Sequence, residues 1–370
     1  MTEWKECTIA DLGMVVGGAT PSTKDPENYN GGMIPWITPK DLSNYSDRYI
    51  SRGERNITEK GLNGCSTQLM PRHSVLFTSR APIGYIAIAD NEVCTNQGFK
   101  SVVPNEQTDY LFLYYLLKFN KEKIEGLGSG TTFKEVSGST MRGITVKVPK
   151  SLDVQRAIGR YLDSIDTKIE INRRINENLA QQAQAIYADI FITNADPAWP
   201  LGHLSDLITV RYGKDHKKLD DGPFPVYGSG GVMRYVERPI YEKESVLIPR
   251  KGTLNNVMYV NEPFWSVDTM FFTEMKLPDV AKFVFHFVKS KDLASLNAGS
   301  AVPSMTTDIL NAMELSIPDA ETLKRFESIV GPMYRAMQHN SEESKKLAAV
   351  RDSLLPRLMS GELDVSELDL

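Results

Sequence analysis

The sequence has few cysteines and histidines and no long apolar run. Its 370 residues include three cysteines, Cys7, Cys65 and Cys94, with no CxxC pair, and five scattered histidines. An odd number of unclustered cysteines disfavours a disulfide framework or a structural zinc site. The longest apolar run, residues 110–117, is far below the roughly 18 residues that cross a membrane, and the segment MTEWKECT is unlike a signal peptide. We therefore expect a cytoplasmic protein that binds neither metal nor membrane.

Signature motifs of the common cofactor-dependent enzymes are missing as well. The sequence has no GxxxxGK[ST] phosphate-binding loop and no GxGxxG after a strand. It also lacks the Asn-Pro-Pro or Asp-Pro-Pro motif of amino-methyltransferases. These gaps favour a protein that binds a partner or a polymer and catalyses no reaction itself.

Charge of one sign is not concentrated anywhere along the chain. The net charge is −5, and residues 1–150 hold 17 basic against 16 acidic residues, while residues 196–319 hold 13 against 16. Binding to DNA would therefore depend on local patches and not on a global positive field.

An internal repeat is the strongest positive signal. Trp4, Asp11 and Gly18 recur as Trp199, Asp206 and Gly213 at an offset of 195. Later matches have smaller offsets: residues 74–76 match 245–247 at 171, and residues 144–149 match 313–318 at 169. Several matches in the same order indicate a duplicated plan whose second copy has lost loop residues.

Each copy is followed by a long helical pattern with a heptad seam. The first seam comprises Ile158, Leu162, Ile165, Ile169, Asn172, Asn176, Leu179, Ala183, Ile186 and Ile190. The second comprises Phe326, Val330, Met333, Met337, Asn340, Ser344, Leu347, Arg351, Leu354 and Leu358, with Val350 able to pack in place of Arg351. Such seams keep one stripe of a helix against a partner helix. Asp319 is a candidate N-cap of the second helix and Gly361 a natural stop.

Polar residues in the middle of both seams predict the register of the pair. A seam asparagine fixes register because a shifted alignment would bury it without a partner. If the helices are antiparallel, Asn172 faces Ser344 and Asn176 faces Asn340, whereas a parallel pair would place Asn172 beside Asn340. The need to carry the chain from one copy to the next favours the antiparallel coiled coil. The alternative is that each helix packs only on its own globular domain.

The predicted fold is α+β, with two duplicated mixed α/β domains separated by two long helices. Short β-branched runs bounded by Gly and Pro indicate strands, and each copy has one strongly apolar helix, at residues 110–119 and 280–288. The expected segments are residues 1–150, a first domain; 151–195, a central helix; 196–319, a second domain; 320–360, a C-terminal helix; and 361–370, a tail.

Glycine-rich, polar and moderately basic loops are the remaining candidates for function. Small residues let a backbone approach a surface closely, Arg and Lys can contact phosphates or guanine, and Asn can read adenine. The candidate DNA contacts are Thr78, Ser79, Arg80, Thr131, Thr132 and Lys134 in the first copy, and Lys214, Lys217, Ser229, Arg250, Lys251, Asn255 and Asn256 in the second. The same loops could equally be ordinary turns.

One pattern imitates a nuclease site. Asp268, Glu274 and Lys276 have the D-x5-E-x-K spacing of metal-dependent nucleases. The matching stretch of the first copy, residues 94–103, contains no carboxylate, which disfavours a catalytic role shared by the copies.

The repeat and the C-terminal motif together resemble the specificity subunit of a Type I restriction–modification system. The closing segment, residues 351–363, reads RDSLLPRLMSGEL, and the first helix opens with Pro149-x5-Gln155-Arg156-x-Ile158, similar to the Pro-Pro-Leu-x-Glu-Gln opening of that family. The second opening, Pro318-Asp319-Ala320, departs further from the family pattern.

The resemblance implies a non-catalytic subunit that reads double-stranded DNA. Each globular domain would be a target recognition domain for one half of a split sequence, and the paired helices would set the spacing between the halves. The helices would also dock two modification subunits, which would use S-adenosylmethionine to methylate adenine, and restriction subunits would supply ATP-driven translocation. This chain itself would need no cofactor. Two other hypotheses remain open at this point: a coiled-coil scaffold without DNA readout, and a metal-dependent nuclease.

Overall fold

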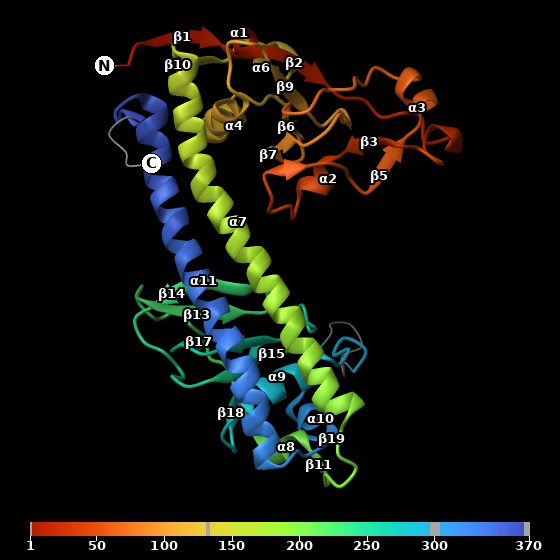
Figure 1. Cartoon of the computed structure of the whole chain (residues 1–370), viewed down its shortest axis with the longest axis vertical. Coiled ribbons are helices and arrows are strands. Elements are labelled where there is room, and N and C mark those ends of the chain that lie inside the picture. Colours follow the sequence, from red (N-terminus) through yellow and green to blue (C-terminus); the bar gives the residue numbers. More distant parts are fainter. Residues whose placement is uncertain (1, 131–133, 297–303, 366–370) are drawn as a thin grey trace. The chain divides into compact units, whose positions relative to one another are not determined.

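The computed structural model describes residues 2–130, 134–296 and 304–365, which form two compact units (Figure 1). Unit 1 comprises residues 1–173 and 341–370, and unit 2 comprises residues 174–340. The two long helices, α7 (Leu152–Ala188) and α11 (Ala320–Ser360), each contribute one part to each unit. A π-helical turn, Asp189–Thr193, follows α7. The segments expected at 151–195 and 320–360 are thus helices, but contacts assign each of them to both units. None of the described helices is long and apolar enough to cross a membrane.

Unit 1 combines three sheets with short helices. Its strands are β1 Trp4–Thr8, β2 Gly13–Gly17, β3 Ile34–Ile37, β4 Tyr49–Ile50, β5 Arg55–Ile57, β6 Val75–Ser79, β7 Ile83–Ala89, β8 Cys94–Thr95, β9 Lys100–Pro104 and β10 Thr145–Pro149. Its short helices are α1 Ile9–Leu12, α2 Pro39–Leu42, α3 Glu59–Asn63, α4 Tyr110–Phe119, α5 Lys121–Gly126 and α6 Gly138–Gly143. The sheets have the orders β2-β9-β6-β7-β4, β5-β3-β8 and β1-β10.

Unit 2 repeats this plan with fewer elements. Its strands are β11 Leu201–His203, β12 Ile208–Tyr212, β13 Phe224–Gly228, β14 Gly231–Val236, β15 Ser245–Pro249, β16 Met258–Val260, β17 Trp265–Ser266, β18 Met270–Met275 and β19 Glu314–Ser316. Its short helices are α8 Leu204–Leu207, α9 Ala281–Lys289 and α10 Thr307–Asn311. The sheets have the orders β12-β18-β15-β16, β14-β13-β17 and β11-β19.

Strand registers confirm the duplication at the offsets found in the sequence. Val15 pairs with Val102 in unit 1, and the matching Val210 pairs with Thr273 in unit 2. Likewise Val75 pairs with Ile88, and Val246 pairs with Tyr259. Sequence reasoning left the strand order open. The order is the same for four strands of the main sheet in each unit, β2-β9-β6-β7 in unit 1 and β12-β18-β15-β16 in unit 2.

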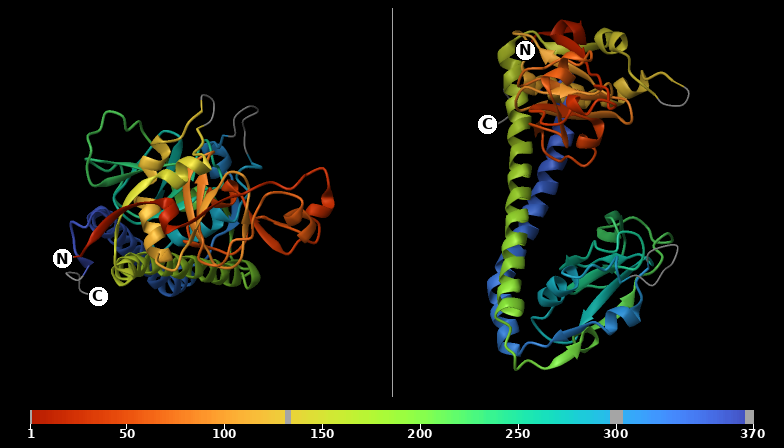
Figure 2. Two further views of the ribbon diagram at one scale, coloured as in Figure 1. Left: turned by 90° about the horizontal axis from the view of Figure 1, so that it is seen from above. Right: turned by 90° about the vertical axis from the view of Figure 1, so that its right-hand side faces the viewer.

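The main sheet of each unit is buried on both faces, because successive side chains of a strand point to opposite sides. In β6, Val75 and Phe77 pack with α4, α7 and α11, while Leu76 packs with the opposite core. In β15, Val246 and Ile248 pack with α9 and the long helices, while Leu247 packs on the far side. In each unit the sheets accordingly lie to one side of α7 and α11 (Figure 2).

A matched glycine is required where two backbones meet. A Cβ on Gly18 would lie 2.2 Å from the Thr95 carbonyl oxygen, and one on Gly213 would lie 2.5 Å from that of Ser266. Both distances are shorter than real Cβ contacts. The repeated glycine seen in the sequence thus serves close packing at the end of β2 and of β12.

The long helices pair antiparallel within each unit, as predicted. In unit 1, Asn172 donates from Nδ2 to Ser344 Oγ at 3.2 Å. In unit 2, Asn340 donates from Nδ2 to Asn176 Oδ1 at 2.9 Å. Residues late in α7 lie beside residues early in α11. In unit 2, for example, Tyr187 packs near Phe326. The hypothesis that each helix packs only on its own domain is therefore wrong.

One detail of the seam differs from the prediction. Val350 does not replace Arg351, because Val350 is 45% exposed and the Arg351 guanidinium forms an ion pair with Asp166 on α7. Tyr115 also donates to Asp166, at 2.8 Å. A buried carboxylate gives the arginine a charged partner inside the seam, which the apolar Val350 would not do.

Candidate DNA-binding surface

The candidates of unit 1 gather at the end of β6, but two of them are internal. Thr78 and Ser79 are fully buried. The Thr78 hydroxyl donates to the Pro82 carbonyl and accepts from the Tyr85 amide, both at 2.8 Å, and Ser79 donates to the Gly98 carbonyl at 3.2 Å. The Thr78 hydroxyl closes the β6–β7 turn and the Ser79 hydroxyl bonds to the segment before β9, so neither is available to DNA.

Arg80 is the partly exposed member of this group, with 36% of its side chain accessible. Its guanidinium lies 3.4 Å from the Glu135 carboxylate, which also lies 3.4 Å from Lys100 Nζ. The exposed Lys134 is the residue before Glu135. Unit 1 therefore has two cations around one carboxylate, with Lys134 next to it in the sequence. Thr131 and Thr132 lie outside the described residues.

Arg250 and Lys251 occupy the equivalent place in unit 2. The isolated bridge between Lys251 and Ser304 matches the bridge between Arg80 and Glu135 in unit 1. Lys251 is exposed, and Arg250 stacks over the Tyr212 ring at 5.3 Å. Ser304 thus stands where unit 1 has a carboxylate, so the same corner of the fold carries a different charge in the two units.

The polar candidates of unit 2 make contacts within the fold. Asn255 donates to the Asp292 carboxylate at 3.0 Å and accepts from the Ala294 amide at 3.0 Å. Asn256 donates to the Ser229 carbonyl at 2.8 Å, which ties the β13–β14 turn to the loop after Arg250 and Lys251. Lys214 and Lys217 are exposed in the loop that follows β12. Ser229, Asn256 and Lys251 thus lie close together in the structure. Asn255 is instead hydrogen-bonded to the segment around Asp292.

Two residues of the nuclease-like triple make other contacts. Glu274 accepts from Arg211 at 3.1 Å, and Lys276 donates to the Ser205 carbonyl at 2.6 Å. Within residues 2–130, 134–296 and 304–365, three or more His, Cys, Asp or Glu side chains never group as metal ligands would.

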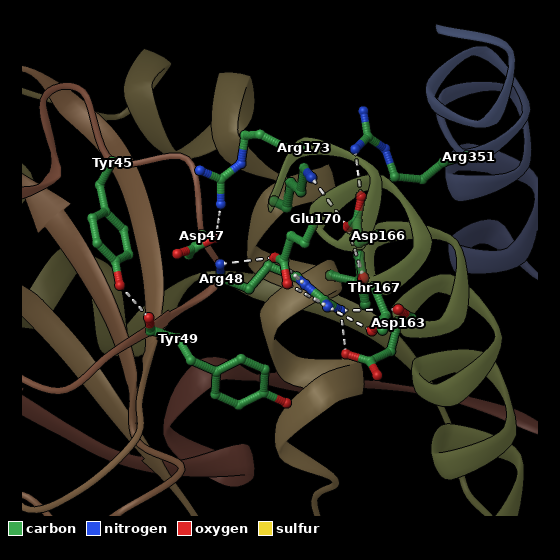
Figure 3. Close-up of polar contacts among 12 residues, drawn as sticks. Tyr45, Asp47, Arg48, Tyr49, Asp163, Asp166, Thr167, Glu170, Arg173 and Arg351 are labelled. Carbon is green, nitrogen blue, oxygen red and sulfur yellow. Dashed lines mark hydrogen bonds and ion pairs between the residues drawn. The ribbon is translucent and has the colours of Figure 1, made fainter. Parts of the chain in front are cut away.

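A buried polar cluster around Arg48, which sequence reasoning missed, joins the sheet region of unit 1 to α7 (Figure 3). Arg48 is 5% exposed. Its guanidinium forms ion pairs with Asp163 and Glu170 and donates to Thr167 Oγ1 at 2.7 Å. The neighbouring Asp47 forms an ion pair with Arg173 on the same helix. The only sequence signal is the spacing of four and three between Asp163, Thr167 and Glu170, which places these α7 residues on one face of the helix. The residues next to Arg48 in the sequence do not indicate its role.

Beside this cluster, the electrostatics of Asp166 favour its charged form. Burial alone would raise the pKa of Asp166, but Lys118 and Arg351 outweigh it and lower that pKa. Burial lowers the pKa of Lys118, although Asp166 partly opposes this. The carboxylate between the two helices therefore stays ionised and holds both cations.

Unit 2 is joined to the helices by different residues. Lys282 of α9, 3% exposed, donates to Glu244 and to Glu327 of α11, each at 2.9 Å. His286 of α9 lies 2.8 Å from Gln184 Oε1 of α7 and 2.9 Å from the Tyr334 hydroxyl of α11. Burial, with a smaller contribution from Lys289, lowers the pKa of His286 to about 4. The histidine is thus neutral and links both helices.

The motifs that carry the resemblance have structural roles in unit 1. Gln155 is 2% exposed and accepts from the Asp109 amide at 3.1 Å, which joins the starts of α7 and α4. In the closing segment, Leu358 is buried, and Gly361 ends α11 with a φ of 78°. A Cβ on Gly361 would lie 2.5 Å from the Trp4 indole nitrogen. The C-terminal motif therefore completes the core of unit 1.

Comparison with known proteins supports the same family. The family model described as the Type I restriction modification DNA specificity domain matches residues 1–181 and 198–347. The Type I restriction enzyme MjaIX specificity subunit of Methanocaldococcus jannaschii is 31% identical, over 99% of this chain and 95% of that protein. The Type I restriction enzyme EcoprrI specificity subunit of Escherichia coli is 22% identical, over 82% and 81%. In fold, the chain is similar to the crystal structure of a Type I restriction–modification S subunit from M. genitalium, with a TM-score of 0.65, 19% identity, and 97% and 96% of the two chains covered.

Proposed function

The chain belongs to the Type I restriction–modification DNA specificity family and is a DNA sequence-specificity subunit, and we propose that each of its units reads one half of a bipartite DNA target. The observation that carries this proposal is the duplication. Two units share strand order and register, yet differ at the exposed ends of the equivalent strands β6 and β15. Copies that keep a scaffold but change its exposed end are suited to reading two different sequences.

Exposed or partly exposed cations at these ends and in the loop after β12 are the proposed phosphate and base contacts. Arg80 and Lys134 in unit 1, and Lys214, Lys217 and Lys251 in unit 2, can bind phosphates or guanine edges. Because the chain has no strongly basic segment, these local groups would have to supply the attraction to DNA.

The paired helices are the proposed spacer and docking element. Each helix is continuous and carries residues of both units, and the seam asparagines fix its register in each unit. We propose that the pair sets the number of unread base pairs and docks two modification subunits. Those subunits would bind S-adenosylmethionine and methylate adenine, restriction subunits would use ATP, and this cytoplasmic chain would bind no cofactor.

Mapping of methylated adenines in cells with and without this chain tests the proposal. The expected result is a methylated motif with two short specific blocks separated by indifferent base pairs, present only with the chain. A single continuous motif, or methylation that does not depend on the chain, would contradict it.

Two variants separate the proposal from its rivals. Replacing both Arg80 and Lys251 by Ala should weaken DNA retention by the assembled complex, whereas a scaffold without DNA readout would retain DNA unchanged. If the isolated chain cut DNA with added Mg²⁺ and Glu274→Ala abolished cutting, the chain would be a nuclease.

A further inference from the structure

The small three-stranded sheets are the part of the plan in which the two units diverge most. The edge strand of the unit 1 sheet, β5, presents Arg55 and Asn56, and Arg55 stacks over the Tyr29 ring at 4.1 Å. The edge strand of the unit 2 sheet, β14, instead presents Val232, Met233 and Tyr235, which are 44%, 61% and 42% exposed. One edge is polar and cationic, and the other is apolar.

The apolar edge is held firmly by the rest of unit 2. Arg234 donates to the Leu219 carbonyl at 2.9 Å and to the Asp221 carboxylate at 2.8 Å. At the turn between β13 and β14, the Ser229 carbonyl accepts from Asn256 at 2.8 Å. Because the turn and the middle of β14 are both held, the exposed side chains are presented on a rigid support and not on a loose loop.

An exposed cation lies beside the turn of this hairpin. The position of a Cβ on Gly252 lies 2.7 Å from Ser229 Oγ, and the preceding residue, Lys251, is exposed. The turn is thus next to one of the proposed phosphate contacts. An apolar strip next to such a cation suits a duplex, in which phosphates flank base edges. Of the groups on those edges, the thymine C5-methyl is the one that apolar side chains contact in the major groove.

We infer that the β13–β14 hairpin is a thymine-reading element of unit 2, in which Val232 and Met233 contact C5-methyl groups of its half-site. The inference rests on the proposed function and names a part of the molecule that reads bases. Unit 1, with Arg55 and Asn56 on the corresponding edge, would read its half-site through hydrogen bonds and not through methyl groups.

Substitution of single thymines by deoxyuridine tests the inference, because it removes only the methyl group. The half-site of unit 2 is first identified as the one whose recognition is lost in Lys251→Ala. The assembled methyltransferase complex should then bind DNA with deoxyuridine at one or two positions of that half-site roughly threefold to tenfold more weakly. Binding of the double variant Val232→Ala, Met233→Ala should be as weak, and it should no longer respond to deoxyuridine.

A matched control is Leu277→Ala, which truncates another exposed apolar side chain of unit 2 (40% exposed). This control should keep the deoxyuridine effect. If the double variant still responds to deoxyuridine like the parent, or if the parent never responds, the inference is wrong while the bipartite reading survives. If the double variant instead fails to assemble with the modification subunit, the hairpin is a protein-docking edge. Loss of any bipartite motif in the parent would count against the proposed function itself.

Discussion

At the scale of single residues, Glu135 and Ser304 distinguish the two corners that we propose to face DNA. Glu135 lies 3.4 Å from both Arg80 and Lys100, and Ser304 is the residue bridged to Lys251 in unit 2. Glu135→Ser should raise non-specific DNA affinity, because the cations lose their carboxylate. The slope of log K against log salt should steepen by about one unit per released cation. Ser304→Glu should weaken affinity.

Salt titrations of the assembled complex on unrelated DNA, monitored by fluorescence anisotropy, measure the affinity and the salt slope of the Glu135→Ser and Ser304→Glu variants. Glu106→Ser, which removes an exposed carboxylate elsewhere in unit 1, is the control and should change the slope less than Glu135→Ser. Equal changes for the two variants would mean that Arg80 and Lys100 do not face DNA.

A buried neutral histidine makes the stability of unit 2 depend on pH. The pKa of His286 is lowered to about 4 in the folded chain, against about 6.5 in an unfolded chain. Between these two pH values the unfolded state therefore binds more protons than the folded state. The contribution of His286 to the free energy of unfolding is fully present above about pH 6.5 and is lost as the pH falls toward 4. The shift corresponds to about 3 kcal/mol at most.

Hydrogen exchange of α9 amides, corrected for the intrinsic pH dependence of exchange, checks this loss. Protection should fall between pH 7 and pH 5 in the parent chain and change less in His286→Gln, which has no titrating side chain at this position. Equal pH dependence in both proteins would show that another group is responsible.

At the scale of the helical elements, the seam contains a charged pair where a coiled coil usually has apolar residues. Asp166, 5% exposed, accepts from both Arg351 and Tyr115. Arg351→Leu should destabilise unit 1 by about 2–4 kcal/mol, because the carboxylate loses one of its cations. The double variant Asp166→Leu, Arg351→Leu should recover only part of that loss, since it removes the charged pair but leaves the Tyr115 hydroxyl and Lys118 without the carboxylate.

Urea unfolding of the four proteins of this double-mutant cycle measures the coupling. A coupling free energy near zero would mean that the ion pair does not stabilise the contact between α7 and α11. The result matters for function because this pair is part of the proposed spacer.

At the scale of the whole molecule, the two continuous helices are the proposed spacer that sets the distance between the two half-sites on DNA. Inserting seven residues in phase into both α7 and α11 lengthens each helix by about 10 Å, or about three base pairs at 3.4 Å each. We expect the unread gap of the methylated motif to lengthen by about that number, with both half-sites unchanged, as read by methylation mapping. Insertion into one helix alone should abolish methylation because the seam register is lost. An unchanged gap in the double insertion would refute a spacer role.

The sequence by itself determined the features that repeat or have a period. The duplication, the two long helices, the partners Asn172–Ser344 and Asn176–Asn340, and the family follow from offsets, heptads and a C-terminal motif that are visible along the chain. Periodicity and repetition are local or translational properties, so they need no knowledge of the fold.

Only the tertiary structure decided which of the candidate residues are exposed and which are internal. Thr78 and Ser79 share a polar motif with Arg80, yet they are buried because a strand of a two-faced sheet carries them into the core. The spacing on α7 was the one sequence signal of the Arg48 cluster, and the β14 edge gave none, since the partners lie 15 to 122 residues away in the sequence. Burial and charge pairing depend on chain segments that meet only after folding, and that is the physical reason why sequence reasoning located the scaffold more reliably than the reading surface.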